Sequence, residues 1–246
     1  MRFNPQHICF TFDVEWACRE AIEDTCRLLD ERGIAGTFFV THDGVSVPGH
    51  ERGLHPNFRR DGDIYQTLPS AAHRSETEVM REILVATKRF APEARGVRAH
   101  SLFFDSTLLP IYAAHGIEYD STYRLELQPG IQPFLKQDNV LEIPAYYADY
   151  YDLVTGTTGF QVAGLKMDQP GLKVVDFHPN LIYTNVSTAQ EYAAIKLFYH
   201  DPERLLAARH GGRGIRTLFV ELLDFVAGQM TPTATLGEVN KAWRDQ

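Results

Sequence analysis

The sequence lacks most of the features of a secreted or membrane-spanning protein. It has only three cysteines in 246 residues, Cys9, Cys18 and Cys26. An odd number without metal-binding spacing indicates reduced thiols and not a disulfide framework. No stretch approaches the ~18 consecutive apolar residues of a membrane span. The start of the chain, MRFNPQHICF, also lacks the apolar core of a signal peptide, which favours a cytoplasmic location.

Positive charge is also scarce. The chain has 24 Lys and Arg against 32 Asp and Glu, a formal net charge of −8. This balance argues against a protein that binds nucleic acid or an anionic membrane surface. The composition is otherwise that of a globular protein, and the length suits one large α/β domain over residues 1–246. The sequence leaves the oligomeric state open.

Strand-like and helix-like patterns alternate along the chain. Buried strands are predicted within 7–14, 34–41, 94–101, 117–122, 140–151 and 172–185, and helices within 18–33, 75–90, 106–116, 188–199 and 214–229. Ser75 and Glu78 form a capping-box pattern at the start of the second helix. Repeated strand–helix units predict a mostly parallel sheet, either open or closed into a barrel.

Ionisable residues follow several of the predicted strands. Asp13 and Glu15 end the first strand, Arg98 and His100 end a later one, and His178 ends the segment VVDFHP. Ligands of parallel α/β sheets bind beyond the carboxyl ends of the strands. We therefore expect these side chains to lie along one rim.

Several of these residues have a plain structural interpretation as well as a functional one. Asp13 and Glu15 should point to the same side of an extended segment, where they would repel each other unless a cation or a proton intervenes. A solvated strand end or a helix cap is the alternative. Arg98 is either a surface arginine or a residue that holds a carboxylate in a bidentate contact. His178 is either a buried imidazole bonded to a carbonyl or a general acid.

Histidines in the long polar stretch 41–72 and just after it are candidate metal ligands. His55 lies in GHERGLHPNF, and His73 directly precedes a predicted helix. An isolated histidine is more often structural, so the pattern alone leaves both interpretations open. Imidazole combined with carboxylate suits Zn²⁺, with Co²⁺, Ni²⁺ or Mn²⁺ as alternatives.

Five segments in order resemble the polysaccharide deacetylase family, also described as the NodB-homology domain or carbohydrate esterase family 4. They are FTFDVE, GIAGTFFVT, GHERGLHPN, GVRAHSLFFDSTLLPIYAAHGIEYDST and VVDFHPNLIY. The resemblance covers roughly residues 8–185. It implies a distorted (β/α) barrel of about seven strands and a metal-dependent hydrolase that removes N-acetyl groups from sugars.

The resemblance also implies a role for each matching residue. Asp13 takes the place of the general base, Glu15 of the metal-binding acid and His55 of the first metal histidine. Arg98 would orient Asp13, and His178 would be the general acid that protonates the leaving amine.

The chain departs from the family pattern in two ways. Val14 separates the two acids, which are usually adjacent aspartates. The second metal histidine usually lies four residues after the first, where this chain has Arg59, a poor ligand because it stays protonated. His73 is the natural substitute for it, and His100 is another.

The remaining predictions concern the substrate. His100, Trp16 and Asp149 are candidate substrate-binding residues, although packing is the simpler explanation for most aromatic residues nearby. A cytoplasmic enzyme would act on an N-acetylated sugar that is nucleotide-linked, lipid-linked or part of a small oligosaccharide, as in O-antigen or capsule biosynthesis. The rival hypotheses are an allantoinase-like C–N hydrolase of the same fold, with or without a metal, and a degenerate, non-catalytic sugar-binding protein.

Overall fold

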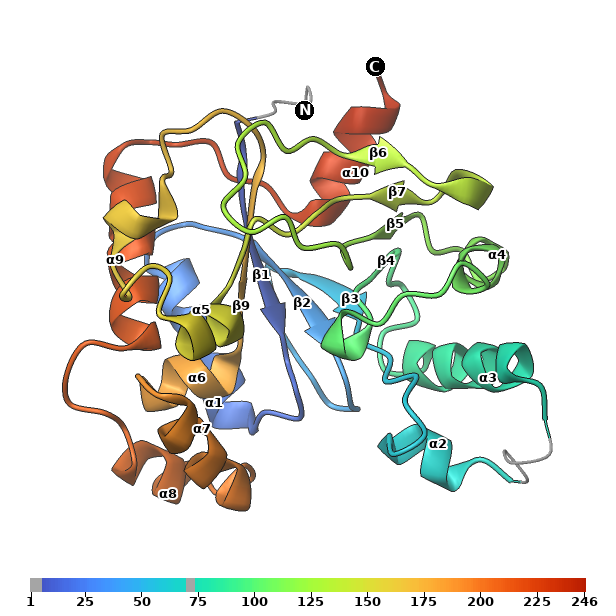
Figure 1. Cartoon of the computed structure of the whole chain (residues 1–246), viewed down its shortest axis with the longest axis horizontal. Coiled ribbons are helices and arrows are strands. Elements are labelled where there is room, and N and C mark those ends of the chain that lie inside the picture. Colours follow the sequence, from blue (N-terminus) through green and yellow to red (C-terminus); the bar gives the residue numbers. More distant parts are fainter. Residues whose placement is uncertain (1–5, 70–73) are drawn as a thin grey trace.

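A computed structural model describes residues 6–69 and 74–246 and contains one nine-stranded sheet. The sheet has the order β6-β7-β5-β4-β3-β2-β1-β9-β8 and is curled and open, like half of a barrel (Figure 1). The strands are β1 (Ile8–Asp13), β2 (Gly36–Val40), β3 (Glu51–Leu54), β4 (Gly96–Val97), β5 (Tyr119–Asp120), β6 (Phe134–Leu135), β7 (Leu141–Glu142), β8 (Tyr147–Ala148) and β9 (Lys173–Phe177).

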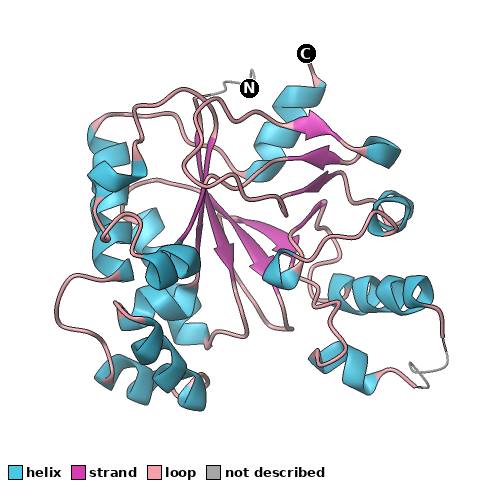
Figure 2. Ribbon diagram, in the orientation of Figure 1, coloured by secondary structure: helices cyan, strands magenta, loops and turns pink. Residues whose placement is uncertain are grey.

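Helices connect the strands and cover the sheet (Figure 2). They are α1 (Arg19–Asp30), α2 (Asp63–Thr67), α3 (Glu76–Lys88), α4 (Leu108–Ala114), α5 (Asp149–Thr155), α6 (Pro179–Thr184), α7 (Ala189–Ile195), α8 (Pro202–Ala207), α9 (Ile215–Gly228) and α10 (Leu236–Arg244). Short 3₁₀ turns include η2 (His100–Leu102) and η5 (Lys196–Phe198). None of the described helices is long and apolar enough to cross a membrane.

The sheet is parallel except at one edge, where β6 runs antiparallel to β7. Strand β1 lies inside the sheet and pairs with β2 on one side and β9 on the other. The carboxyl ends of β1, β2 and β3 point away from the two chain termini in Figure 1. Because the paired strands run in the same direction, the residues that follow them are delivered to one end of the sheet.

Aromatic residues of β1, β2 and β9 form the centre of the core with α9. Phe12 stacks on Phe38 with ring centroids 4.4 Å apart, and Phe219 of α9 packs edge-on against Phe12 at 5.7 Å. All three side chains are fully buried. Helix α6 packs against both α1 and α9, which anchors the segment that directly follows β9.

The predicted α/β class with a curled, barrel-like sheet is confirmed, but the sheet has nine strands and not about seven. Five strands contain only two residues each and give little signal in the sequence. Strand β3 was predicted as part of a polar loop. Gly53 lies within it because the ring of Phe39 occupies the space of a Cβ, and not because a turn requires it.

The predicted helices are present with small shifts in their bounds. The capping box of Ser75 and Glu78 starts α3 as expected. The segment 172–185 is strand only as far as Phe177, after which Pro179 begins α6. A single domain over residues 1–246 stays a prediction.

Candidate active site

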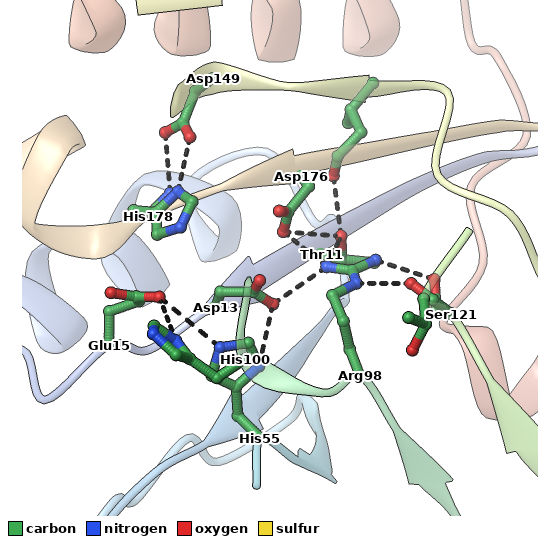
Figure 3. A network of polar contacts seen from close by, with 12 residues as sticks. Thr11, Asp13, Glu15, His55, Arg98, His100, Ser121, Asp149, Asp176 and His178 are labelled. Atoms are coloured by element: carbon green, nitrogen blue, oxygen red, sulfur yellow. Dashed lines mark hydrogen bonds and ion pairs between the residues drawn. The ribbon is translucent and has the colours of Figure 1, made fainter. Parts of the chain in front are cut away.

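Asp13 and His178 line one pocket of about 470 Å³, and His55 and Arg98 lie outside its lining but 3.7 and 3.1 Å from Asp13 Oδ1. Asp13 ends β1, His55 directly follows β3, Arg98 directly follows β4 and His178 directly follows β9. Figure 3 shows these side chains turned toward one another, together with His100, which lies two residues beyond Arg98. These side chains therefore lie together at one end of the sheet, as expected. His55, Arg98 and His178 come directly after their strands and not within them.

Arg98 is fully buried and lies between two carboxylates. Its Nη1 donates to Asp13 Oδ1 at 3.1 Å, to Asp176 Oδ1 at 2.5 Å and to Thr11 Oγ1 at 2.9 Å. Its Nε donates to the carbonyl oxygen of Ser121 at 2.9 Å. Each carboxylate receives one contact from the guanidinium, so the expected bidentate contact is absent. These bonds nevertheless fix the direction of the Asp13 side chain.

Glu15, His55 and His100 form a cluster whose candidate ligand atoms all lie within 4.8 Å of one another. His100 Nδ1 lies 2.8 Å from Glu15 Oε1, and His55 Nε2 lies 3.7 Å from the same oxygen. Burial alone would raise the pKa of Glu15, but the two imidazoles hold this pKa well below its usual range. The two imidazoles that face Glu15 therefore favour the charged form of its carboxylate.

Unusual backbone conformations bring this cluster together. Glu15 and Trp16 have φ of 48° and 56°, and Ser101 has φ of 57°, all in the left-handed region that non-glycine residues rarely adopt. Glu15 therefore reaches the site through a turn after β1, and not through the strand alternation that was expected. Such strain persists only where the surrounding structure imposes it, and it concentrates at functional sites.

His178 is held by Asp149 on the other side of the pocket. Its ring Nδ1 lies 2.6 Å from Asp149 Oδ1, and its backbone N–H donates to Asp149 Oδ2 at 2.8 Å. Burial lowers the pKa of His178, but Asp149 more than offsets this and raises the pKa well above its usual value. The carboxylate fixes the tautomer and direction of the ring, so that Nε2 is the nitrogen free to face the pocket.

The structure places the other candidate residues as follows. His73 lies outside the described residues. Asp149 is fully buried and contacts His178, so it supports that ring and does not line the pocket. Trp16 packs edge-on against His100 and donates from its indole to Asp63 Oδ2 at 3.1 Å. It lines a neighbouring hollow and not this pocket.

Asp176, which lies within β9, was not predicted as a site residue. Residue Thr11 pairs with Asp176 in the register of β1 and β9, which puts both next to the guanidinium of Arg98. Burial raises the pKa of Asp176, against the opposing effect of Arg98. The signal in the sequence was a carboxylate in the middle of the otherwise apolar segment VVDF.

The fold agrees with the comparisons to known proteins. A crystal structure from Bordetella bronchiseptica, described as a polysaccharide deacetylase involved in O-antigen biosynthesis, is similar with a TM-score of 0.76 and 25% identity over 90% of this chain and 91% of that one. A polysaccharide deacetylase structure from Mycobacterium smegmatis has a TM-score of 0.59 and 17% identity over 98% of this chain and 90% of that one. A comparison with curated protein sequences found no match.

These similarities define a carbohydrate deacetylase fold. The family model "WbmS-like: Polysaccharide deacetylase" matches residues 10–196, which is most of the chain. The chain therefore belongs to the WbmS-like polysaccharide deacetylase family and is an enzyme of the deacetylase class.

Proposed function

We propose that the chain is a metal-dependent hydrolase that removes the N-acetyl group from an amino sugar of a surface polysaccharide or its precursor. The observation that carries the proposal is the meeting of two differently supported groups in one pocket. Asp13 is held by Arg98, His178 is held by Asp149, and candidate ligand atoms of Asp13 and His178 lie within 4.8 Å of each other. Amide hydrolysis needs such a pair, one group to accept a proton and another to donate one.

The residues present fit a divalent metal at the Glu15 cluster. Nδ1 of His100 already lies 2.8 Å from Glu15 Oε1, but the two ring nitrogens of His55 are buried and form no hydrogen bond among the described residues. Such orphaned atoms are costly unless an ion or water meets them. One carboxylate and two imidazoles match the donor set that Zn²⁺ prefers, and Co²⁺, Ni²⁺ or Mn²⁺ remain alternatives.

A second acidic group, made of Asp13, Asp176 and His178, is a poorer candidate for the metal. Arg98 already places its positive charge between the two aspartates of that group. A dication there would have to overcome repulsion from a fully buried guanidinium. We therefore assign the ligand role to Glu15, His55 and His100, with His100 in the position for which His73 was the first choice.

The side chains then have separate tasks. When bound, a divalent metal would polarise the amide carbonyl and lower the pKa of an attacking water molecule. Asp13 accepts a proton from that water, and Arg98 keeps the carboxylate in the orientation to do so. His178 donates a proton from Nε2 to the departing nitrogen, while Asp149 stabilises the imidazolium before transfer. The products are acetate and the free amino sugar.

The proposal is tested by measuring acetate release from a panel of N-acetylated sugars with metal added and withdrawn. We expect release by the wild-type protein, loss on chelation and recovery with Zn²⁺. Asp13→Asn should lower kcat by about 10²- to 10⁴-fold, as expected for removal of a general base. Asp245→Asn, at the end of α10, is the matched control and should retain full activity.

Two results would contradict the proposal. Wild-type rates in Asp13→Asn would remove this carboxylate from the reaction. Hydrolysis of a cyclic ureide such as allantoin, without acetate release from any sugar and without effect of chelation, would favour the rival C–N hydrolase.

A further inference from the structure

The rim of the active-site pocket is basic although the chain as a whole is acidic. Three cationic side chains line it, Arg59, Arg124 and Lys196, in a protein with a formal net charge of −8. The acidic residues of the same lining are Asp13, Glu15 and Asp176. They lie at the floor, where Arg98, His55 and His100 already face them. The acidic groups of the floor are therefore already paired and do not serve as ion-pair partners for the basic groups of the rim.

Arg124 is the best-supported of the three cations. It lies after β5, and its backbone forms an isolated β-bridge with Ala145, another residue of the pocket wall. Its guanidinium lies over the ring of Tyr151, with Cζ 3.7 Å from the ring centroid. This stacking holds the planar group in place on the wall. A guanidinium held in this way presents its N–H groups as a fork that matches a carboxylate or a phosphate.

The carboxylate nearest to Arg124 is a weak partner. Glu126 Oε2 lies 3.5 Å from Arg124 Nε, which is an ion-pair distance without a hydrogen bond. Burial raises the pKa of Glu126 to about 7, against the opposing effect of Arg124. Within the described residues, no hydrogen bond is formed by the guanidinium of Arg124. Its donors are thus available to a ligand in the pocket.

The position of Arg124 relates it to the reacting groups. Tyr151 lies on α5 two residues after Asp149, the carboxylate that holds His178. The stacked guanidinium and the proton donor are therefore supported by the same short helix. Lys196 adds a second positive charge from η5, where its Nζ lies 4.3 Å from the ring centroid of Tyr192, and no described carboxylate forms an ion pair with it.

We propose that the sugar substrate carries an anionic group, a carboxylate or a phosphate, which Arg124 binds with help from Lys196 and Arg59. This inference rests on the proposed deacetylase function and specifies its substrate class. Arg59 already lies 3.4 Å from Asp61 Oδ1, but a neutral sugar would leave the donors of Arg124 and Lys196 without a hydrogen-bond partner among the described residues. A uronic acid and a sugar phosphate offer the same chemistry, an oxyanion pair that a guanidinium binds in a fork.

The experiment compares four probes: the methyl glycoside of N-acetylglucosamine, the corresponding N-acetylglucosaminuronic acid glycoside, N-acetylglucosamine 1-phosphate and UDP-N-acetylglucosamine. Acetate release gives kcat and KM, and calorimetry gives Kd for the inactive Asp13→Asn protein, so that binding is measured without turnover. We expect at least one anionic probe to be preferred over the neutral glycoside. The uronate arm and the two phosphate arms identify the source of the charge.

The variant Arg124→Gln should raise KM and Kd for the preferred anionic probe by about 10- to 100-fold, the usual effect of losing a charge-assisted contact. The affinity for the neutral glycoside should fall much less than that for the anionic probe, and Arg124→Lys should be intermediate. The control is Arg95→Gln, which removes an exposed arginine at the opposite end of β4. It should change neither KM nor Kd for the anionic probe.

The outcomes separate the inference from the function on which it rests. Acetate release with equal preference for neutral and anionic probes, or with an unchanged preference in Arg124→Gln, would overturn the inference and keep the deacetylase. Absence of acetate release from every probe would count against the function. In that case selective binding of an anionic probe that Arg124→Gln abolishes would still support the anion site, and equal binding of all probes would overturn it.

Discussion

At the scale of single residues, the site depends on the charges that surround each reacting group. His178 must carry a proton to act as the acid, so kcat/KM should fall as the pH rises through the pKa of this imidazole. Burial lowers that pKa, and Asp149 raises it well above the usual value. The neighbouring carboxylate therefore extends activity to higher pH.

Replacing that carboxylate tests this dependence. In Asp149→Asn the imidazolium loses its charged partner, its pKa falls, and the alkaline limb of the kcat/KM profile should move to lower pH. The measurement is the pH profile of acetate release, with Asp245→Asn as the control whose limbs stay in place. An unchanged alkaline limb in Asp149→Asn would mean that another group donates the proton.

The residues of the site differ in how far the sequence predicts them. Asp13, Arg98 and His178 stand out because each ends or follows a predicted strand, whereas His55 was singled out by its setting in GHERGLHPNF and by the family resemblance. The close approach of Glu15 and His100 to each other could not be predicted in the same way. It depends on left-handed backbone after β1 and β4, which no periodicity in the sequence signals.

At the scale of secondary-structure elements, the open edge of the sheet is held by a buried ionic cluster. Lys136 follows β6, and its Nζ lies 2.5 Å from Asp120 Oδ2 of β5 and 2.6 Å from Glu142 Oε2 of β7. Asp120 and Glu142 are 1% and 0% exposed. The lysine thus joins two short parallel strands to the antiparallel strand at the edge.

Removing this lysine should destabilise the protein strongly. Lys136→Met leaves two carboxylates buried side by side without a cation, which should lower the free energy of unfolding by about 3–5 kcal/mol. Urea denaturation measures the loss. The control Lys241→Met, at an exposed position of α10, should change the stability by less than about 0.5 kcal/mol. A similarly small loss in Lys136→Met would mean that backbone pairing alone holds the edge.

The shortness of several strands explains why the strand count was wrong. Strands β4 to β8 contain two residues each, and some of them pair with residues distant in sequence, as Val97 of β4 does with Leu54 and Tyr147 of β8 with Val175. Long apolar segments predict β1, β2 and β9 because alternation and burial act along the segment itself. The short strands form because tertiary contacts bring their backbones together, and such contacts are not visible in a local pattern.

At the scale of the whole molecule, the proposed metal site joins segments that lie far apart along the chain. Glu15 follows β1, His55 follows β3 and His100 lies beyond β4, so a bound ion would cross-link three regions of the sheet. An ion that binds only the folded state stabilises it by about 2.7 kcal/mol at 100 times its Kd. For a chain of this size that corresponds to a rise in Tm of about 5–10 °C.

Thermal unfolding of the chelator-treated protein with and without Zn²⁺ therefore tests the ligand set without any substrate. We expect the shift in Tm to disappear in His100→Ala and to persist in His73→Ala and Asp13→Asn, because the cluster contains His100 and excludes the proposed base. Metal content after dialysis should follow the same order. A shift lost in His73→Ala and kept in His100→Ala would return the third ligand position to His73. A shift kept in all three variants would place the ion elsewhere, since His100 supplies one of only three donors in the proposed set.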